Sequence, residues 1–446
     1  MKYGETAGRD VQTPRDHEPT KPICKVRAHS GRPFTASDSS WCQMFLANPV
    51  RAIARAPRPH LLAALGAEGR RRVEAFLPAW RDYRPTPLLA LPTLAATLGV
   101  GAIHIKDEGQ RLGLQSFKAL GGAYAVMSLL LDEGARRLGR DLMPADIFSQ
   151  EMRPIAAAMT VACATDGNHG RSVAAGARLV GCRAVIFLHA GVSQFRAAAI
   201  AALGAEIVRV PGDYDDSVAA AAAKAAREGW VVVSDASWDD YEDVPLTVIQ
   251  GYTVMAGEAL DALAVPPTHL FLQAGVGGMA AAVAAYAAQI LGPAAPKVIV
   301  VEPERAACLL ASARAGRPVV IPHNEPTIMA MLDCRAPSLI AWEILASIAD
   351  GFVTLSEDQA TDSMKRLASP LAMDPAVVAG ESGGAGLAGF LACLCEPEAR
   401  AALGLDRHSR ILVFNTEGAT DPAHYSWIVG RSPGEVAGRL ADIIAP

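Results

Sequence analysis

Four short stretches of the sequence carry polar or reactive side chains at turns that follow apolar runs. They read QSFKALGGAYA at 115–125, ATDGNHGR at 164–171, QAGVGGMAAAV at 273–283 and NTEGATD at 415–421. Parallel sheets bind ligands at the carboxyl ends of their strands, where turns of this kind meet. Each of the four stretches is therefore a candidate part of a ligand-binding site.

The third stretch combines a glycine-rich turn with the start of a helix. Glycines allow backbone N–H groups to approach a phosphate closely, and a helix N-terminus adds a favourable partial positive charge. The turn is not a P-loop, because no Lys-Ser or Lys-Thr pair follows the glycines. Turns of this composition also pack helices onto sheets, so phosphate binding and simple packing both stay open on the pattern alone.

The first stretch places a lysine among apolar neighbours. Lys118 follows Phe117 and precedes Ala119 and Leu120, at the start of an apolar helical pattern. Burial among such residues would lower the pKa of the lysine and allow it to form a Schiff base. The alternative is an ordinary solvated lysine, as most lysines are.

The second stretch contains an acid where an anion-binding turn would favour a neutral residue. Asp166 is either an Asx-type helix cap or a part of the chemistry. Asp235, near the end of the apolar run WVVVSDAS at 230–237, is a second acidic candidate at a strand terminus. For Asp235 a purely structural role is equally open.

The rest of the chain indicates how these turns are positioned. Short apolar runs predict strands at 101–108, 155–164, 184–190, 230–237, 269–275, 297–303 and 410–418. Helical patterns lie at 60–83, 117–138, 193–205 and 215–229, the last capped by Asp216 or Ser217, and 139–154 reads as a surface loop or short helix. Apolar strands that alternate with helices predict an α/β fold with open, mostly parallel twisted sheets covered by helices.

Composition excludes several classes of protein. The 446 residues are 51% hydrophobic and 20% charged, with a formal net charge of −5, which gives no reason to expect a nucleic-acid or membrane partner. The charge-free run 270–296 is interrupted by glycines and glutamines, so it predicts a strand, a loop and a buried helix rather than a membrane span. The eight cysteines lack zinc-ligand spacing and the N-terminus lacks a signal peptide, which favours a cytoplasmic protein without a metal.

The order of these motifs resembles the pyridoxal-phosphate (PLP) enzymes of the tryptophan-synthase-β type, the second PLP fold type. Within that group the chain is most similar to the diaminopropionate ammonia-lyase family. The resemblance covers roughly residues 80 to 425. Besides the four stretches, it rests on YRPTPL (83–88), DYDDSV (213–218), VEPERAAC (301–308), TIMAMLDC (327–334), GESGGAGL (380–387) and TEGATDPAHY (416–425).

The resemblance implies a role for each candidate site residue. Lys118 would hold the cofactor as a Schiff base, Asn168 would contact the pyridoxal 3′ oxygen, and Thr165 would bind the substrate carboxylate. Thr416 would face the pyridine nitrogen and leave it unprotonated. The phosphate would lie on the loop formed by Gly275, Val276, Gly277, Gly278 and Met279. His169 would be a structural residue of its loop, and Glu381 would support the site or neighbour a cation.

The resemblance also implies a domain organisation and an assembly. Residues 46–123 and 247–446 would form a large PLP-binding domain, and 124–246 a smaller α/β domain that carries the TDGNHG turn. Residues 1–45 lie outside the resemblance, and their Pro-, Ser-, Thr-, Arg- and Asp-rich composition without periodicity predicts a flexible extension. The chain would form a homodimer. The sequence leaves open whether Cys308 and Cys334 pair.

The reaction implied is the α,β-elimination of 2,3-diaminopropionate, D or L, to pyruvate and ammonia. Related dehydratases carry a small residue where Asp166 stands, whereas a substrate with a second ammonium group favours an acid there. Asp166 would also remove the Cα proton of the D isomer, and Lys118 that of the L isomer. The alternatives are a serine or threonine dehydratase on the same fold and a non-catalytic PLP-binding protein.

Overall fold

The computed structural model describes residues 44–81, 83–322 and 325–444. Its larger sheet has seven strands in the order β1-β10-β9-β8-β11-β3-β2. The five central strands run parallel, and β1 and β2 pair antiparallel at the two edges. The strands are β1 Phe45–Ala47, β2 Leu88–Ala90, β3 Ala102–Asp107, β8 His269–Gln273, β9 Lys297–Pro303, β10 Gly351–Leu355 and β11 Arg410–Asn415.

The smaller sheet has four parallel strands in the order β6-β5-β4-β7. These are β4 Thr160–Ala164, β5 Arg183–His189, β6 Glu206–Val210 and β7 Val231–Val232. Together the two sheets confirm the predicted α/β class of open, mostly parallel sheets covered by helices. The smaller sheet is built from residues within 124–246, but helix α4 (Lys118–Leu138) crosses the predicted boundary at 123, so the domain limits stay a prediction.

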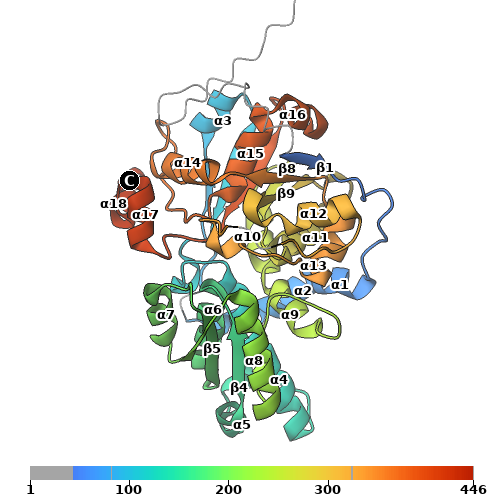
Figure 1. Cartoon of the computed structure of the whole chain (residues 1–446), viewed down its shortest axis with the longest axis vertical. Helices are drawn as coiled ribbons and strands as arrows, with labels where there is room; N and C mark the ends of the chain where they lie inside the picture. Colours follow the sequence, from blue (N-terminus) through green and yellow to red (C-terminus); the bar gives the residue numbers. More distant parts are fainter. Residues whose placement is uncertain (1–43, 82, 323–324, 445–446) are drawn as a thin grey trace, which may run out of the picture.

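Helices cover both sheets, and Figure 1 shows α4 to α8 around the smaller sheet and α10 to α16 around the larger one. The remaining helices are α1 Pro59–Ala64, α2 Ala67–Glu74, α3 Pro92–Leu98, α5 Met152–Ala158, α6 Asn168–Val180, α7 Gln194–Ala201, α8 Tyr214–Glu228, α9 Asp243–Gly251, α10 Thr253–Ala262, α11 Gly278–Leu291, α12 Cys308–Ala315, α13 Leu339–Ile348, α14 Glu357–Ala368, α15 Ala385–Cys395, α16 Pro397–Leu403, α17 Pro422–Val429 and α18 Pro433–Ile444. None of the helices that the structure describes combines the length and apolarity needed to cross a bilayer.

Several local expectations need correction. The cap of α8 is Asp213, whose carboxylate accepts the N–H of Asp216 in a reciprocal capping box, so the helix begins earlier than expected. The predicted helix 60–83 is divided into α1, α2 and a short 3₁₀ turn, and 139–154 holds another 3₁₀ turn and the start of α5. Strand β1, which starts at Phe45, was not expected. The predicted flexible extension otherwise lies outside the described residues.

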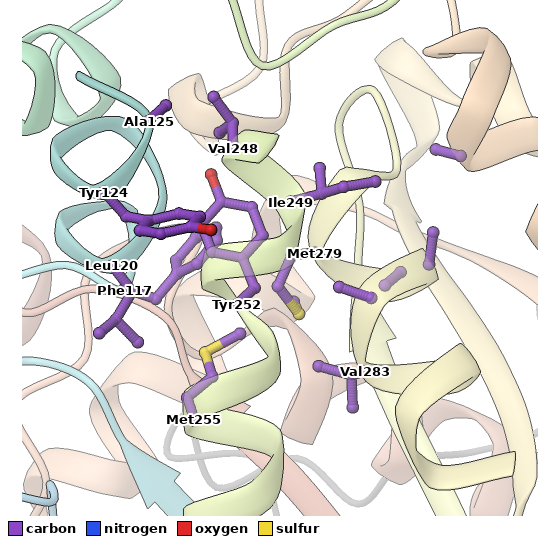
Figure 2. Packing of buried hydrophobic residues seen from close by; sticks show 14 of the residues in the cluster. Phe117, Leu120, Tyr124, Ala125, Val248, Ile249, Tyr252, Met255, Met279 and Val283 are labelled. Atoms are coloured by element: carbon purple, nitrogen blue, oxygen red, sulfur yellow. The ribbon is translucent and has the colours of Figure 1, made fainter. Parts of the chain in front are cut away.

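A buried cluster holds the start of α4 against the junction of α9 and α10 and against α11, the helix that follows the glycine turn. Figure 2 shows Phe117, Leu120 and Tyr124 packed against Tyr252 and Met279. The rings of Phe117 and Tyr252 meet edge to face with centroids 4.7 Å apart. Because this cluster is fully buried, the first residue of α4 and the glycine turn before α11 are fixed relative to each other.

Candidate active site

One pocket, with about 840 Å³ of empty space, collects all four turns. The residues predicted to bind the cofactor or the substrate all line it: Lys118, Thr165, Asp166, Asn168, Asp235, Gly275, Val276, Gly277, Gly278, Met279 and Thr416. Glu381, the predicted supporting residue, is not among the lining residues. The role of each residue stays a prediction.

Lys118 forms an ion pair with Asp235 inside the pocket. Burial acts to lower the pKa of Lys118, but the charge of Asp235 and the phenol of Tyr252 outweigh it and raise that pKa above its usual range. The expected lowering was therefore wrong, because nothing in the local sequence indicates that Asp235 is the neighbour of Lys118. Conversely, burial acts to raise the pKa of Asp235, but the Lys118 ammonium holds it well below its usual range.

Asp166 does not cap a helix. The N-cap of α6 is Gly167, with φ 153°, and the hydroxyl of Thr165 accepts the N–H groups of Gly167 and Gly170 at 3.0 and 3.1 Å. Asp166 Oδ1 instead lies 2.7 Å from Nε2 of His189, a residue that sequence reasoning missed. Thr165 is thus the residue that caps this turn, and the carboxylate of Asp166 is left for the pocket.

A second acidic pair lies behind Asn168. The Asn168 side-chain amide donates to Glu417 Oε2 at 2.6 Å. Burial, with a further contribution from Glu381, raises the pKa of Glu417 to about 7. Burial also raises the pKa of Glu381, and His424 Nδ1 lies 3.1 Å from Glu381 Oε1 without hydrogen-bond geometry. Glu417 lies in the motif TEGATDPAHY, but the sequence pattern indicated no role for it.

Replacing Glu417 with Gln is expected to change how stability depends on pH. In the folded protein this carboxyl keeps its proton up to about pH 7, whereas in the unfolded chain it loses it near its ordinary value of 4.5. Its contribution to stability is therefore present below about pH 4.5 and is lost as the pH rises to 7, by up to about 1.4 kcal/mol per pH unit.

Urea unfolding of the protein and Glu417→Gln from pH 5 to 8 measures this slope. The free energy of unfolding of the variant should fall less steeply across the window. Glu398→Gln, which changes an exposed carboxylate on α16, should keep the parent slope. Parallel curves for the parent and Glu417→Gln would contradict the assigned pKa.

The loop between β8 and α11 can hold a phosphate only because it is glycine-rich. A Cβ on Gly275 would lie 2.8 Å from Cys334 Sγ, and one on Gly278 would lie 2.8 Å from Ile249 Cγ2. Gly277, the N-cap of α11, has φ 95°, a conformation that other residues rarely adopt. The first N–H groups of this 14-residue helix have no partner within the helix, so they are free to bind an anion.

Uncharged groups line the floor of the pocket. Gln273 Nε2 donates to Thr416 Oγ1 at 3.0 Å and to the Phe414 carbonyl at 2.9 Å. Ser382 Oγ and Gln273 Oε1 are buried without a hydrogen-bond partner among the described residues. Cys308 and Cys334 are free thiols that both lie near Gly275. Cys308 Sγ donates to the Gly275 carbonyl at 3.6 Å, and Cys334 Sγ is the atom that a Cβ on Gly275 would approach to 2.8 Å.

These features together define the class of protein. A family model described as pyridoxal-phosphate dependent enzyme matches residues 79–417, and the chain belongs to this family. PLP is thus its cofactor. Among the described residues, no group of His, Cys, Asp and Glu is arranged to hold a metal ion.

Particular members of this family are similar to the chain over most of its length. Diaminopropionate ammonia-lyase of Escherichia coli strain K12 is 39% identical over 361 residues, which cover 80% of this chain and 89% of that protein. The crystal structure of diaminopropionate ammonia lyase from Escherichia coli with an aminoacrylate-PLP azomethine reaction intermediate has a TM-score of 0.76 and 36% identity, over 86% of this chain and 96% of that one. The same enzyme in complex with D-serine has a TM-score of 0.78 and 35% identity, over 88% and 97%.

The residues of the pocket fit PLP. Lys118 supplies an amine for the cofactor's aldehyde carbon, and the glycine loop with the start of α11 leaves room that a Cβ would fill. The hydroxyls of Ser382, which is buried and has no hydrogen-bond partner in the described part of the chain, and of Thr416 are neutral groups suited to a pyridine nitrogen. The Asn168 amide has a second N–H besides the one given to Glu417, which suits the 3′ oxygen.

Proposed function

We propose that the chain catalyses the α,β-elimination of 2,3-diaminopropionate, as the D and L isomers, to pyruvate and ammonia. The observation that carries the proposal is the presence of two carboxylates, Asp166 and Asp235, in the pocket that also holds Lys118 and the phosphate loop. A substrate with one ammonium group at Cα and a second at Cβ offers charges that match these acids. The similarity to diaminopropionate ammonia-lyases supports the same substrate.

PLP, when bound, supplies an electron sink for the negative charge that develops at Cα. Lys118 would hold the cofactor and, once the substrate amine has taken its place, acts as the base for the Cα proton of the L isomer. Asp235, as its ion-pair partner, stabilises Lys118 in the protonated form after that transfer. Asp166 removes the Cα proton of the D isomer.

The carboxylates also account for the leaving group. A β-ammonium group that pairs with an acid already carries the proton with which it departs as ammonia, while the Cα electron pair forms the Cα–Cβ double bond. The eliminated 2-aminoacrylate then hydrolyses to pyruvate and a second molecule of ammonia. Thr165 and the turn amides beside it are proposed to bind the substrate carboxylate, and Asn168 and Thr416 to hold the cofactor ring.

A serine or threonine dehydratase would share the cofactor residues but has no use for two acids, because a β-hydroxyl carries no charge. A non-catalytic PLP-binding protein would not need the Lys118–Asp235 pair. We further propose that the chain works as a homodimer in the cytoplasm on small amino acids. Light scattering after gel filtration tests the assembly.

Turnover of matched substrates tests the proposal. The purified PLP-loaded protein is assayed with D- and L-2,3-diaminopropionate, D- and L-serine and L-threonine by release of the 2-oxo acid. Loss of one partner of a buried charge pair costs about 3–5 kcal/mol, so kcat/KM for diaminopropionate should exceed that for serine by roughly 100-fold or more. Equal or faster turnover of serine or threonine would make the chain a dehydratase.

Replacing Gly277 with Ala is expected to weaken cofactor binding. A residue with a side chain at φ 95° is strained by about 1–3 kcal/mol, and its Cβ would lie 3.1 Å from the side chains of Leu309 and Ala341. The loop therefore shifts, and the Kd for PLP should rise about 10- to 100-fold. Fluorescence titration of the apoprotein with PLP measures this, with Gly434→Ala, where a Cβ meets nothing within 4 Å, as the control. An unchanged Kd would mean that the phosphate lies elsewhere.

A further inference from the structure

The partner of Asp166 is placed by the register of the smaller sheet. Strands β4 and β5 run parallel with Ala164 opposite Phe187. Asp166 and His189 each follow these positions by two residues, so they lie side by side at the carboxyl edge of the sheet, where His189 is the last residue of β5. Their side chains meet there, with Asp166 Oδ1 2.7 Å from His189 Nε2, and they are 23% and 21% exposed.

The backbone fixes which ring nitrogen carries the proton. The N–H of Gly191 donates to His189 Nδ1 at 3.1 Å, and a nitrogen that accepts this bond carries no hydrogen. In the neutral ring the proton is therefore on Nε2, which donates to Asp166. The ring approaches Gly191 so closely that a Cβ there would lie 2.8 Å from His189 Cε1, so residue 191 must be small for this geometry.

The charged surroundings favour the contact. The hydrogen bond to Asp166 raises the pKa of His189 above its ordinary value, burial lowers it, and the charge of Asp213 raises it. Arg209, on the neighbouring β6, lowers it and donates to the His189 carbonyl at 3.3 Å. On the other side of Asp166, the phenol of Tyr214 and the thiol of Cys334 line the same pocket.

We propose that His189 is a positioning residue for Asp166 and so determines how well the enzyme accepts the D isomer, an inference that rests on the proposed function. The ring holds Oδ1 and leaves Oδ2 for the Cα proton of the substrate. Protonation of the His189 ring places a hydrogen on Nδ1, which then repels the N–H of Gly191. It also makes Asp166 the anion of an ion pair, and a carboxylate held in an ion pair is a weaker base. Turnover of the D isomer therefore depends on a titration that turnover of the L isomer does not share.

Three variants of the holoprotein test this with both isomers. In His189→Leu, kcat for the D isomer should fall about tenfold or more, which is less than the 10²- to 10⁴-fold expected when the general base itself is lost, while the L isomer keeps its rate. His189→Gln retains a donor at the position of Nε2, so it should restore most of the D-isomer rate. It cannot titrate, so the part of the D-isomer pH profile that is due to His189 should disappear. His408→Leu, an exposed control, should change nothing.

A measurement without substrate separates the inference from the proposed function. In the NMR spectrum of ¹⁵N-histidine-labelled protein, the resonance missing from His189→Gln identifies this ring, and its pKa should be above 6.5 and fall in Asp166→Asn. An unshifted resonance, or equal loss of D- and L-isomer turnover in His189→Leu, would overturn the inference. Failure of the parent protein to turn over either isomer would instead overturn the proposed function and leave the NMR result standing.

Discussion

Replacing Lys118 with Ala is expected to remove the visible absorbance of the holoprotein and to abolish pyruvate release from both isomers. Among the residues that the structure describes, no other lysine lines the pocket, so Lys118 is the amine there that can bond to the aldehyde carbon of PLP. Because Lys118 is also the proposed base for the L isomer, the L-isomer rate should fall about 10³-fold or more. Absorbance spectra of the dialysed protein and a coupled pyruvate assay measure the two effects.

The variant also leaves the buried Asp235 without its ion-pair partner, which can destabilise the fold. Lys118→Arg keeps a positive charge beside Asp235 and should lose the visible band all the same. Lys224→Ala, which changes a lysine on the outer face of α8, should keep both the band and the rate. A normal visible band in both Lys118 variants would show that another residue holds the cofactor.

Replacing Asp166 with Asn separates the two isomers. The amide is nearly the same size and keeps an oxygen that can accept the His189 Nε2–H, but it cannot take a proton from Cα. We expect kcat for D-2,3-diaminopropionate to fall 10²- to 10⁴-fold, as for the loss of a general base, with a much smaller effect on the L isomer. Single-isomer assays of pyruvate release give this ratio directly.

Asp216→Asn, at an exposed position of the α8 capping box, is the matched control and should leave both rates unchanged. Equal losses with D and L isomers would show that Asp166 acts only by binding the β-ammonium group. No loss with either isomer would make Asp166 a structural turn residue and would remove the main argument against a dehydratase.

The parts of the site could be predicted because each lies at the end of a parallel strand, where ligands bind. The loop from Gly275 to Met279 and Thr416 follow the neighbouring strands β8 and β11 of the larger sheet, and Asp166 follows β4 of the smaller one. Lys118 was found from its apolar neighbours, which the structure places in the core between α4 and α10.

The contacts that tune these groups could not be predicted, because they join distant parts of the chain. The pKa of Lys118 depends on Asp235, 117 residues away, so the sequence-based expectation that this pKa is lowered was wrong. His189 meets Asp166 only through the register of β4 and β5, and Glu417 meets Asn168 across 249 residues. Strand β1 was missed because three residues are too short to show a pattern and pair only with β10.

The ratio of products tests the central claim most directly. Purified PLP-loaded protein is given L- or D-2,3-diaminopropionate, and ammonia and pyruvate are measured in the same reaction. Elimination followed by hydrolysis of 2-aminoacrylate predicts two molecules of ammonia for each molecule of pyruvate, with no product from the Lys118→Ala variant. No pyruvate from diaminopropionate, together with pyruvate and a single ammonia from serine, would contradict the account and identify a dehydratase.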